Sequence, residues 1–142
     1  MILYLDASAL VKRYVAEAGS VQVAEAINVA ELVGASVITR AEVAAALAKT
    51  VRVGALAQDE ALSALQTFRG EWLDIFRLQL SELTAARADA FAWEYGLRGY
   101  DAVHLATASL WQDAMAERIT FMTFDRKLWD AAGRAGLLPL GM

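Results

Sequence analysis

Short apolar runs alternate along the chain with longer segments in which apolar residues recur every three or four positions. The short runs are typical of buried strands, and the longer segments are typical of amphipathic helices. We predict strands over residues 2–5, 32–38, 75–78, 119–124 and 137–140, and helices over 7–15, 20–29 (with Ser20 as a candidate cap), 39–53, 58–74, 81–95, 100–113 and 126–135.

This alternation predicts the fold class. Strands separated by helices are joined by crossover connections, which produce a mostly parallel sheet covered by helices on both faces. We therefore expect an α/β protein, a three-layer α/β/α sandwich. A length of 142 residues, 58% of them hydrophobic, fits a single domain over residues 1–142, and no linker or repeat interrupts the pattern.

Composition excludes several kinds of chemistry. The absence of cysteine rules out disulfides, thiolate zinc sites and cysteine nucleophiles, and no glycine-rich phosphate loop is present. The first residues lack the basic segment of a signal peptide, and no apolar run is long enough to cross a membrane, so we expect a soluble cytoplasmic protein with no membrane partner. The net charge of −4 is unusual for a nucleic-acid-binding protein unless its acids surround a metal ion.

Four acidic residues lie where predicted helices begin: Asp6, Glu42, Asp101 and Asp125. Each one alone fits a capping role, because acids suit the first turn of a helix and Thr39 and Glu42 have the spacing of a capping box. Asp6 and Asp125 also follow strands directly. In open parallel sheets ligands bind beyond the carboxyl ends of the strands, so the four carboxylates can converge there.

Convergence of the four acids predicts a bound cation. Two carboxylates about 4 Å apart repel each other by about 4 kcal/mol at an effective dielectric constant of about 20. A divalent ion removes this repulsion, and ligands that are all oxygen favour Mg²⁺ or Mn²⁺ over zinc. The sequence therefore indicates either four separate helix caps or one acidic metal site.

Other polar residues have two interpretations each. Ser8 and Thr123 lie two residues from Asp6 and Asp125 and suit either a contact to a metal-bound phosphate or water, or an ordinary backbone role. We interpret His104, the single histidine, as a packed and hydrogen-bonded side chain, and the four tryptophans as core or interface residues. Basic residues near the acids in sequence suit either the phosphates of a polyanion or plain solvation: Lys12, Arg13, Arg40, Arg98, Arg126 and Lys127.

Four segments in order resemble the acidic motifs of PIN-domain nucleases, most closely the VapC-type toxins of bacterial toxin–antitoxin pairs: YLDASALVKRY, TRAEVAAAL, GYDAVHLATA and TFDRKLW. The resemblance spans residues 6–128 and implies the PIN-like α/β/α fold. It implies one or two Mg²⁺ or Mn²⁺ ions held by four catalytic acids with two polar side chains beside them: Asp6, Glu42, Asp101 and Asp125, with Ser8 and Thr123.

The same resemblance implies an activity and partners. It implies hydrolysis of an RNA phosphodiester by water, in structured RNA such as transfer or ribosomal RNA, leaving a 5′-phosphate and a 3′-hydroxyl. Either Asp101 or Asp125 can be the carboxylate that orients or deprotonates the attacking water. The implied partners are a VapB-like antitoxin, with an Arg- or Lys-bearing segment that enters the acidic site, and a second copy of the chain in a homodimer.

Three other functions compete with an RNA-cleaving toxin. A non-catalytic PIN-like module that binds protein or RNA is disfavoured because all four acids are present. Another Mg²⁺-dependent phosphate enzyme is disfavoured because Asp6, Ala7 and Ser8 do not form a DxD motif. A DNA-cutting nuclease of the same fold needs the same acids, and the sequence leaves that alternative open.

Overall fold

A five-stranded parallel sheet forms the middle layer of the protein in the computed structural model, which describes residues 1–142. The strands lie in the order β3-β2-β1-β4-β5, so β1 is central and has β2 and β4 on either side. The five strands are β1 (Ile2–Leu5), β2 (Leu32–Ser36), β3 (Phe76–Leu78), β4 (Ile119–Thr123) and β5 (Leu138–Gly141).

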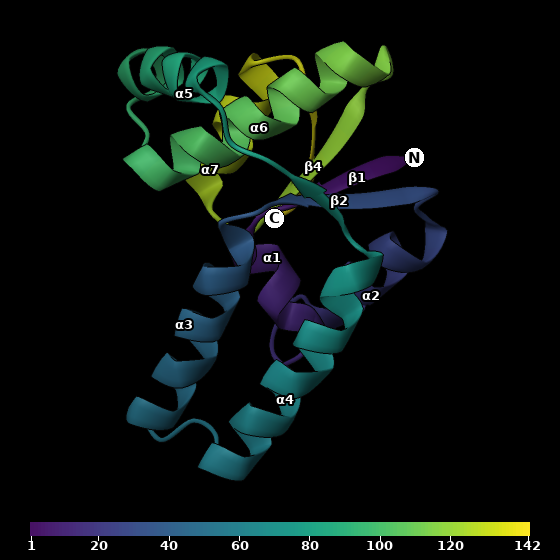
Figure 1. Ribbon diagram of the computed structural model, residues 1–142, viewed down its shortest axis with the longest axis vertical. Coiled ribbons are helices and arrows are strands. Elements are labelled where there is room, and N and C mark those ends of the chain that lie inside the picture. The colour runs from purple at the N-terminus through teal and green to yellow at the C-terminus, as the bar shows by residue number, and fades with distance from the viewer.

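Helices cover both faces of this sheet. Helices α5, α6 and α7 lie above it in Figure 1, and α1, α2, α3 and α4 lie below it. This arrangement confirms the predicted three-layer α/β/α fold. The helices are α1 (Ala7–Leu10), α2 (Ser20–Val29), α3 (Thr39–Arg52), α4 (Gln58–Glu71), α5 (Glu82–Tyr95), α6 (Gly99–Met115) and α7 (Arg126–Arg134).

The central position of β1, covered by helices on both faces, explains why its sequence is apolar throughout. Successive side chains of a strand point to opposite faces of the sheet. Ile2 and Tyr4 belong to the core under α5, α6 and α7, whereas Leu3 and Leu5 belong to the core under the other helices. A strand that is covered on both faces therefore has no polar face, and the first polar residue after it is Asp6.

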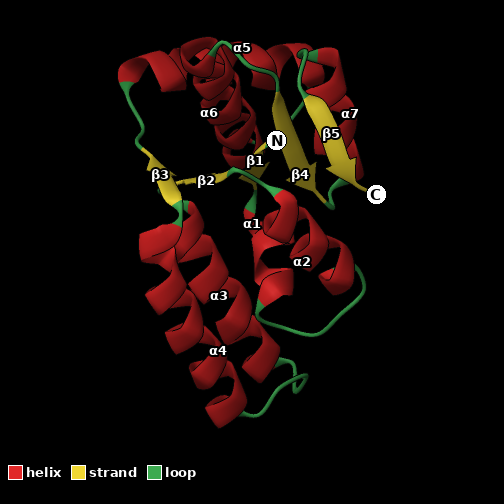
Figure 2. Cartoon of the chain, turned by 90° about the vertical axis from the view of Figure 1, so that its right-hand side faces the viewer, coloured by secondary structure: helices red, strands yellow, loops and turns green.

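Helices α3 and α4 extend well beyond the sheet as an antiparallel pair (Figure 2). They are joined by a short connection around Gly54, whose φ of 76° lies in the left-handed region that glycine adopts easily. The end of α3 that carries Glu42 lies next to the sheet, and the other end lies far from it. This pair of helices therefore forms a projecting arm whose base lies at the carboxyl edge of the sheet.

Several predicted element boundaries differ from the structure, and local contacts explain some of these differences. The strand predicted over 32–38 ends at Ser36, because the Ser36 hydroxyl accepts a hydrogen bond from the Ile38 amide (3.3 Å) and turns the chain into α3. The helix predicted over 7–15 is α1 followed by a short 3₁₀ turn over Val11–Arg13. Gly19, not Ser20, is the N-cap of α2, and the Ser20 hydroxyl donates to the Val15 carbonyl (3.0 Å).

None of the seven helices has both the length and the apolar character required to cross a lipid bilayer.

Candidate metal and catalytic site

Asp6 enters the site because β1 and β4 pair in register. Leu5 lies opposite Met122 in the parallel ladder, so Asp6 and Thr123 leave the sheet side by side. The Asp6 amide continues the ladder by donating to the Met122 carbonyl (3.2 Å). The Asp6 side chain therefore lies at the carboxyl edge of the two central strands, where ligands bind in sheets of this type.

The Asp6 carboxylate is buried and accepts three hydrogen bonds. The Ser8 hydroxyl (2.7 Å) and the Ala9 amide (3.0 Å) donate to Oδ1, and the Thr123 hydroxyl (2.6 Å) donates to Oδ2. The bond from Ala9 makes Asp6 the N-cap of α1. Only 4% of the residue is exposed. Burial raises the pKa of Asp6 above its ordinary value, while these three hydrogen bonds lower it.

Ser8 and Thr123 do more than surround Asp6. The Ser8 hydroxyl accepts from the Phe124 amide (3.1 Å), and the Thr123 hydroxyl accepts from the Asp125 amide (3.1 Å). Both hydroxyls therefore tie Asp6 to the backbone that leads into α7. They position Asp6 and Asp125 relative to each other, which links the first and the last of the predicted acids.

Arg98 bridges the other two aspartates. Its Nε donates to Asp101 Oδ2 (3.0 Å), and its Nη2 donates to Asp125 Oδ2 (3.2 Å). The guanidinium also lies over the Tyr100 ring, 4.7 Å from its centroid. Asp125 caps α7 by accepting from the Leu128 amide (2.9 Å), and Asp101 lies in the first turn of α6. Asp125 is thus a true helix cap, Asp101 lies in a first turn without a capping bond, and both carboxylates share one cation.

The environment of Asp101 differs from that of an ordinary surface acid. Burial raises the pKa of Asp101, the hydrogen bond and positive charge of Arg98 lower it, and the negative charge of Asp125 raises it. The net effect is a raised pKa. The carboxylate is therefore destabilised despite its ion pair with Arg98.

Glu42 does not form the capping box that its spacing suggested. Ile38 is the N-cap of α3, and no side chain caps that helix end. Glu42 Oε1 instead lies 2.6 Å from Nε2 of His104 on α6. The Thr39 hydroxyl, the other half of the expected box, is buried without a hydrogen-bond partner. The imidazole of His104 takes the place of the backbone amide as the partner of Glu42.

His104 is packed and hydrogen-bonded, in agreement with our interpretation of the sequence. It is 1% exposed, and its Nδ1 lies 2.6 Å from the Tyr4 hydroxyl. The importance of Tyr4 and Arg98 was missed. Tyr4 is separated from its partner by 100 positions, and in sequence Arg98 is one of six basic residues near the acids.

Hydrogen bonds join these side chains into two sets at the carboxyl edge of the sheet. In the first set, Asp6 is linked to Asp125 through Thr123, and Asp125 to Asp101 through Arg98. In the second set, Glu42 is bonded to His104, which contacts Tyr4.

The donor set fits a hard divalent cation. It consists of carboxylate oxygens, which Mg²⁺ and Mn²⁺ prefer, and its single internal cation is an arginine. The acids as positioned do not form a ready-made cluster of three or more metal-ligating side chains, and two of them are held by Arg98. Arg98 contacts Oδ2 of both Asp101 and Asp125.

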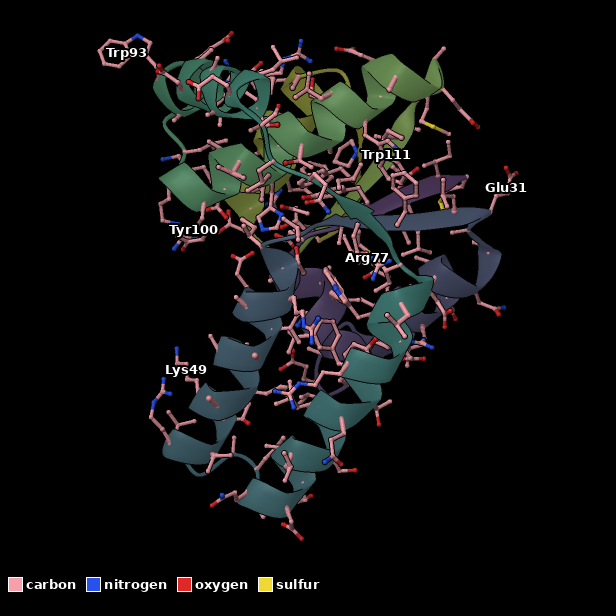
Figure 3. All side chains as sticks on the ribbon, in the orientation of Figure 1. Glu31, Lys49, Arg77, Trp93, Tyr100 and Trp111 are labelled. Atoms are coloured by element: carbon pink, nitrogen blue, oxygen red, sulfur yellow. The ribbon has the colours of Figure 1, made fainter.

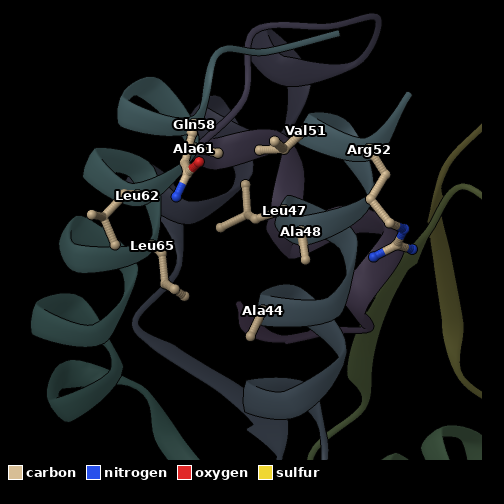
Figure 4. A pocket seen from close by; sticks show the side chains of 9 residues that line it. All are labelled: Ala44, Leu47, Ala48, Val51, Arg52, Gln58, Ala61, Leu62 and Leu65. Atoms are coloured by element: carbon tan, nitrogen blue, oxygen red, sulfur yellow. The ribbon is translucent and has the colours of Figure 1, made fainter. Parts of the chain in front are cut away.

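An apolar groove runs between α3 and α4 (Figure 4). Its volume is about 320 Å³, and seven of its nine lining residues are hydrophobic. Leu47 and Val51 line it from α3, and Leu62 and Leu65 line it from α4. Helix α3 thus presents an acid at one end and an apolar surface along its length.

Comparison with known proteins places the chain in a family. The PIN domain family model matches residues 3–134. Ribonuclease VapC45 and Ribonuclease VapC49, from two strains of Mycobacterium tuberculosis, are each 31% identical over 135 residues, which covers 95% of this chain and 92% of each relative.

Solved structures share the fold. A toxin–antitoxin complex from Klebsiella pneumoniae superposes with a TM-score of 0.70 at 24% identity and covers 99% of both chains. The FitAcB structure from Neisseria gonorrhoeae has a TM-score of 0.63 at 23% identity and covers 94% of both chains. With the family match and the two curated relatives, the chain belongs to the PIN-domain family and, within it, to the VapC ribonucleases.

Proposed function

We propose that this protein is a metal-dependent endoribonuclease, the toxin of a toxin–antitoxin pair, and that Asp6, Glu42, Asp101 and Asp125 form its active site. The observation that carries the proposal is the set of four acids at the carboxyl edge of the sheet, three of them joined by hydrogen bonds through Thr123 and Arg98, in a member of the VapC ribonucleases. Net negative charge at such a site suits a protein that recruits cations and then binds a polyanion.

The four acids would hold one or two Mg²⁺ or Mn²⁺ ions. Such an ion lowers the pKa of a bound water and neutralises charge on the phosphate undergoing attack. Asp6 is suited to be a fixed ligand, because three hydrogen bonds hold its carboxylate in one orientation. Ser8 and Thr123 support Asp6 by hydrogen bonding and would act on the substrate only indirectly, by positioning Asp6.

Asp101 is the better candidate for the base of the two that the sequence left open. Burial raises its pKa above the ordinary value, and a carboxylate with a higher pKa accepts a proton from water more readily. Asp125 has a second duty as the cap of α7, through its bond to the Leu128 amide. In this mechanism Asp101 takes the proton of the attacking water, and cleavage leaves a 5′-phosphate and a 3′-hydroxyl.

Arg98 would exchange partners during the reaction. Its side chain is 61% exposed, and its bonds to Asp101 and Asp125 hold it at the surface of the site. If Asp101 and Asp125 held a divalent ion, the Arg98 guanidinium would no longer be needed to neutralise them and would lie free beside the site. A free guanidinium binds phosphate through paired hydrogen bonds, so Arg98 is positioned to hold the RNA backbone.

The direct test is cleavage of a total RNA pool and of separated transfer and ribosomal RNA, with Mg²⁺ or Mn²⁺ and with EDTA. We expect discrete fragments with 5′-phosphate ends that disappear in EDTA and in Asp6→Asn. Asp89→Asn is the matched control, because Asp89 is an exposed acid on α5. Cleavage that persists in EDTA would overturn the metal-dependent mechanism. Equal cutting of single-stranded DNA would favour the alternative of a general nuclease.

The proposed antitoxin has two surfaces to occupy. A basic side chain would enter the acidic site, where Arg98 already shows that a guanidinium fits between two of the acids. An amphipathic helix would fill the apolar groove between α3 and α4. The Klebsiella pneumoniae protein that shares the fold is itself described as a toxin–antitoxin complex.

The antitoxin proposal is tested by co-expressing this chain with candidate VapB-like antitoxins from the same genome. Co-expression should yield a complex and suppress RNA cleavage. Leu62→Lys, in the groove, should weaken that complex, whereas Val21→Lys, at an exposed position on α2, should not. A complex equally tolerant of both substitutions would contradict the groove as the docking surface. We place this activity in the cytoplasm, where the candidate RNAs occur.

We also propose that two copies associate through α5. Leu83, Ala86, Ala90 and Trp93 are exposed and follow the three- and four-residue spacing of a helix-pairing surface. Trp93 is 91% exposed and points away from the rest of the molecule in Figure 3. An exposed stripe of this kind is typical of an interface. Sedimentation should show a dimer that Trp93→Glu converts to a monomer; an unchanged mass would contradict this surface.

A further inference from the structure

Tyr4, His104 and Glu42 form a chain of hydrogen bonds that crosses from the core to the acidic site. Tyr4 comes from β1, His104 from α6 and Glu42 from α3. The two contacts, from the Tyr4 hydroxyl to Nδ1 and from Nε2 to Glu42 Oε1, are both 2.6 Å. These contacts join residues that lie 100 and 62 positions apart, so only the tertiary fold brings them together.

The direction of the hydrogen bonds follows from the two ends of the chain. An ionised Glu42 has only acceptors, so Nε2 must carry the proton between them. At the other end, the Tyr4 phenol carries its proton at neutral pH, as tyrosine ordinarily does, and is a hydrogen-bond donor. The hydroxyl has no other acceptor among the hydrogen bonds of the structure and therefore donates to Nδ1. Both ends select the same neutral tautomer, protonated on Nε2.

The supporting side chains are immobile. Tyr4 is fully buried and stacks on Phe121, with ring centroids 5.1 Å apart and planes 9° apart. The Tyr4 and His104 rings meet edge to face, with centroids 5.9 Å apart. Neither ring can turn without disturbing the core between the sheet and α6. The donor offered to Glu42 is therefore fixed in direction.

We propose that Tyr4 and His104 are positioning residues that hold Glu42 in one orientation for cation binding, with Tyr4 selecting the histidine tautomer. Glu42 Oε1 is occupied by His104, and no protein group donates to Oε2, which remains available as a ligand. A donor behind a ligating carboxylate orients it and tunes its affinity. This inference rests on the proposed function, because it assigns the supporting shell of the same acidic site.

The tautomer is directly measurable because His104 is the only histidine in the chain. A long-range ¹H–¹⁵N spectrum of the metal-free protein at neutral pH will contain one imidazole. We expect the neutral form protonated on Nε2, and we expect Tyr4→Phe to convert it to a mixture of tautomers. A wild-type imidazole protonated on Nδ1, or on both nitrogens, would overturn the proposal, as would a Tyr4→Phe spectrum identical to that of the wild type.

The positioning role is tested by Mn²⁺ binding, measured by calorimetry. His104→Leu removes the donor and should weaken binding by about tenfold or more, the range known for outer-shell partners of metal ligands. His104→Gln keeps an N–H donor and should recover part of this loss. Phe68→Leu is the control for core damage, because Phe68 is fully buried on α4 in the other core, and it should leave the Mn²⁺ affinity within about twofold.

The outcomes separate this inference from the proposed function. Equal affinities for His104→Leu, His104→Gln and the wild type would overturn the positioning role alone. An equal loss in both histidine variants and in Phe68→Leu would assign the effect to general destabilisation and would also overturn it. A wild-type protein that does not bind Mn²⁺ would overturn the proposed function and the positioning role together, whatever the tautomer.

Discussion

Replacing Asp6 with asparagine separates its structural role from its charge. Asparagine keeps an acceptor oxygen for the Ser8 hydroxyl and the Ala9 amide, so the cap of α1 survives. The other end of the amide meets the Thr123 hydroxyl, which must then accept instead of donate. The substitution therefore replaces the bond from the Thr123 hydroxyl to a charged carboxylate, worth about 1.5–3 kcal/mol, with a weaker bond between neutral groups. It also removes the cost of burying a charge.

The structure indicates that these two effects nearly cancel without metal. Burial raises the pKa of Asp6 in spite of its three hydrogen bonds, which means that desolvation outweighs them. We therefore expect Asp6→Asn to change the free energy of unfolding by no more than about 1 kcal/mol at neutral pH in EDTA. Asp6→Ala leaves the Ala9 amide and two hydroxyls without their acceptor, and we expect it to cost about 2–4 kcal/mol.

Urea unfolding in EDTA, followed by tryptophan fluorescence, measures both values. Added Mg²⁺ should then stabilise the wild type by about 2.7 kcal/mol at a concentration a hundredfold above its Kd, and should stabilise Asp6→Asn far less. If asparagine costs as much as alanine in EDTA, the negative charge itself stabilises the fold and the reasoning from burial is wrong. If Mg²⁺ stabilises both proteins equally, Asp6 is not a ligand.

Three further outcomes are expected. Arg98→Gln should tighten Mn²⁺ binding and weaken RNA binding, and both effects should exceed those of the control Arg126→Gln, because only Arg98 bridges two of the acids. Calorimetry measures the Mn²⁺ affinity and filter binding measures the RNA affinity. Equal effects of the two substitutions would contradict the role of Arg98. In EDTA, the wild type should lose stability relative to Asp6→Asn as the pH rises above 3.8, the ordinary pKa of an aspartate, because the folded state keeps a proton that the unfolded state has released. Urea unfolding at about pH 4 and about pH 7 should show that the difference in the free energy of unfolding between the two proteins widens with pH. A difference that narrows would refute the direction of the pKa shift. Gly34→Ala should destabilise by about 1–3 kcal/mol because a methyl group there would lie 2.5 Å from the Trp111 ring, and an unchanged melt would show that this ring moves freely.

The sequence predicted the fold because its strands and helices have unambiguous patterns. Residues 2–5 are apolar without a break and end at an acid, which is what a strand buried on both faces requires. The same logic predicted that Asp6 and Asp125 lie beyond the carboxyl ends of strands. Family membership is confirmed by the PIN model match and by the two VapC relatives.

The partners of the acids could not be predicted from the sequence. Glu42 has the local spacing of a capping box with Thr39, and the competing partner His104 lies 62 positions away. Nothing local distinguishes Arg98 from the other basic residues, since its bridging role depends on where α6 and α7 begin in space. Local rules describe contacts within one turn of a helix, whereas this site consists of contacts between elements.

Mn²⁺ binding is the most direct test of the central claim, because it does not depend on knowing the RNA. The wild type, Asp6→Asn and the surface control Asp89→Asn are titrated under identical conditions by calorimetry, with the folded fraction of each checked first. We expect the wild type and Asp89→Asn to bind Mn²⁺ with the same Kd and Asp6→Asn to bind it at least about tenfold more weakly. Binding that is unchanged by Asp6→Asn, or absent from the folded wild type, would contradict a metal site built on these carboxylates.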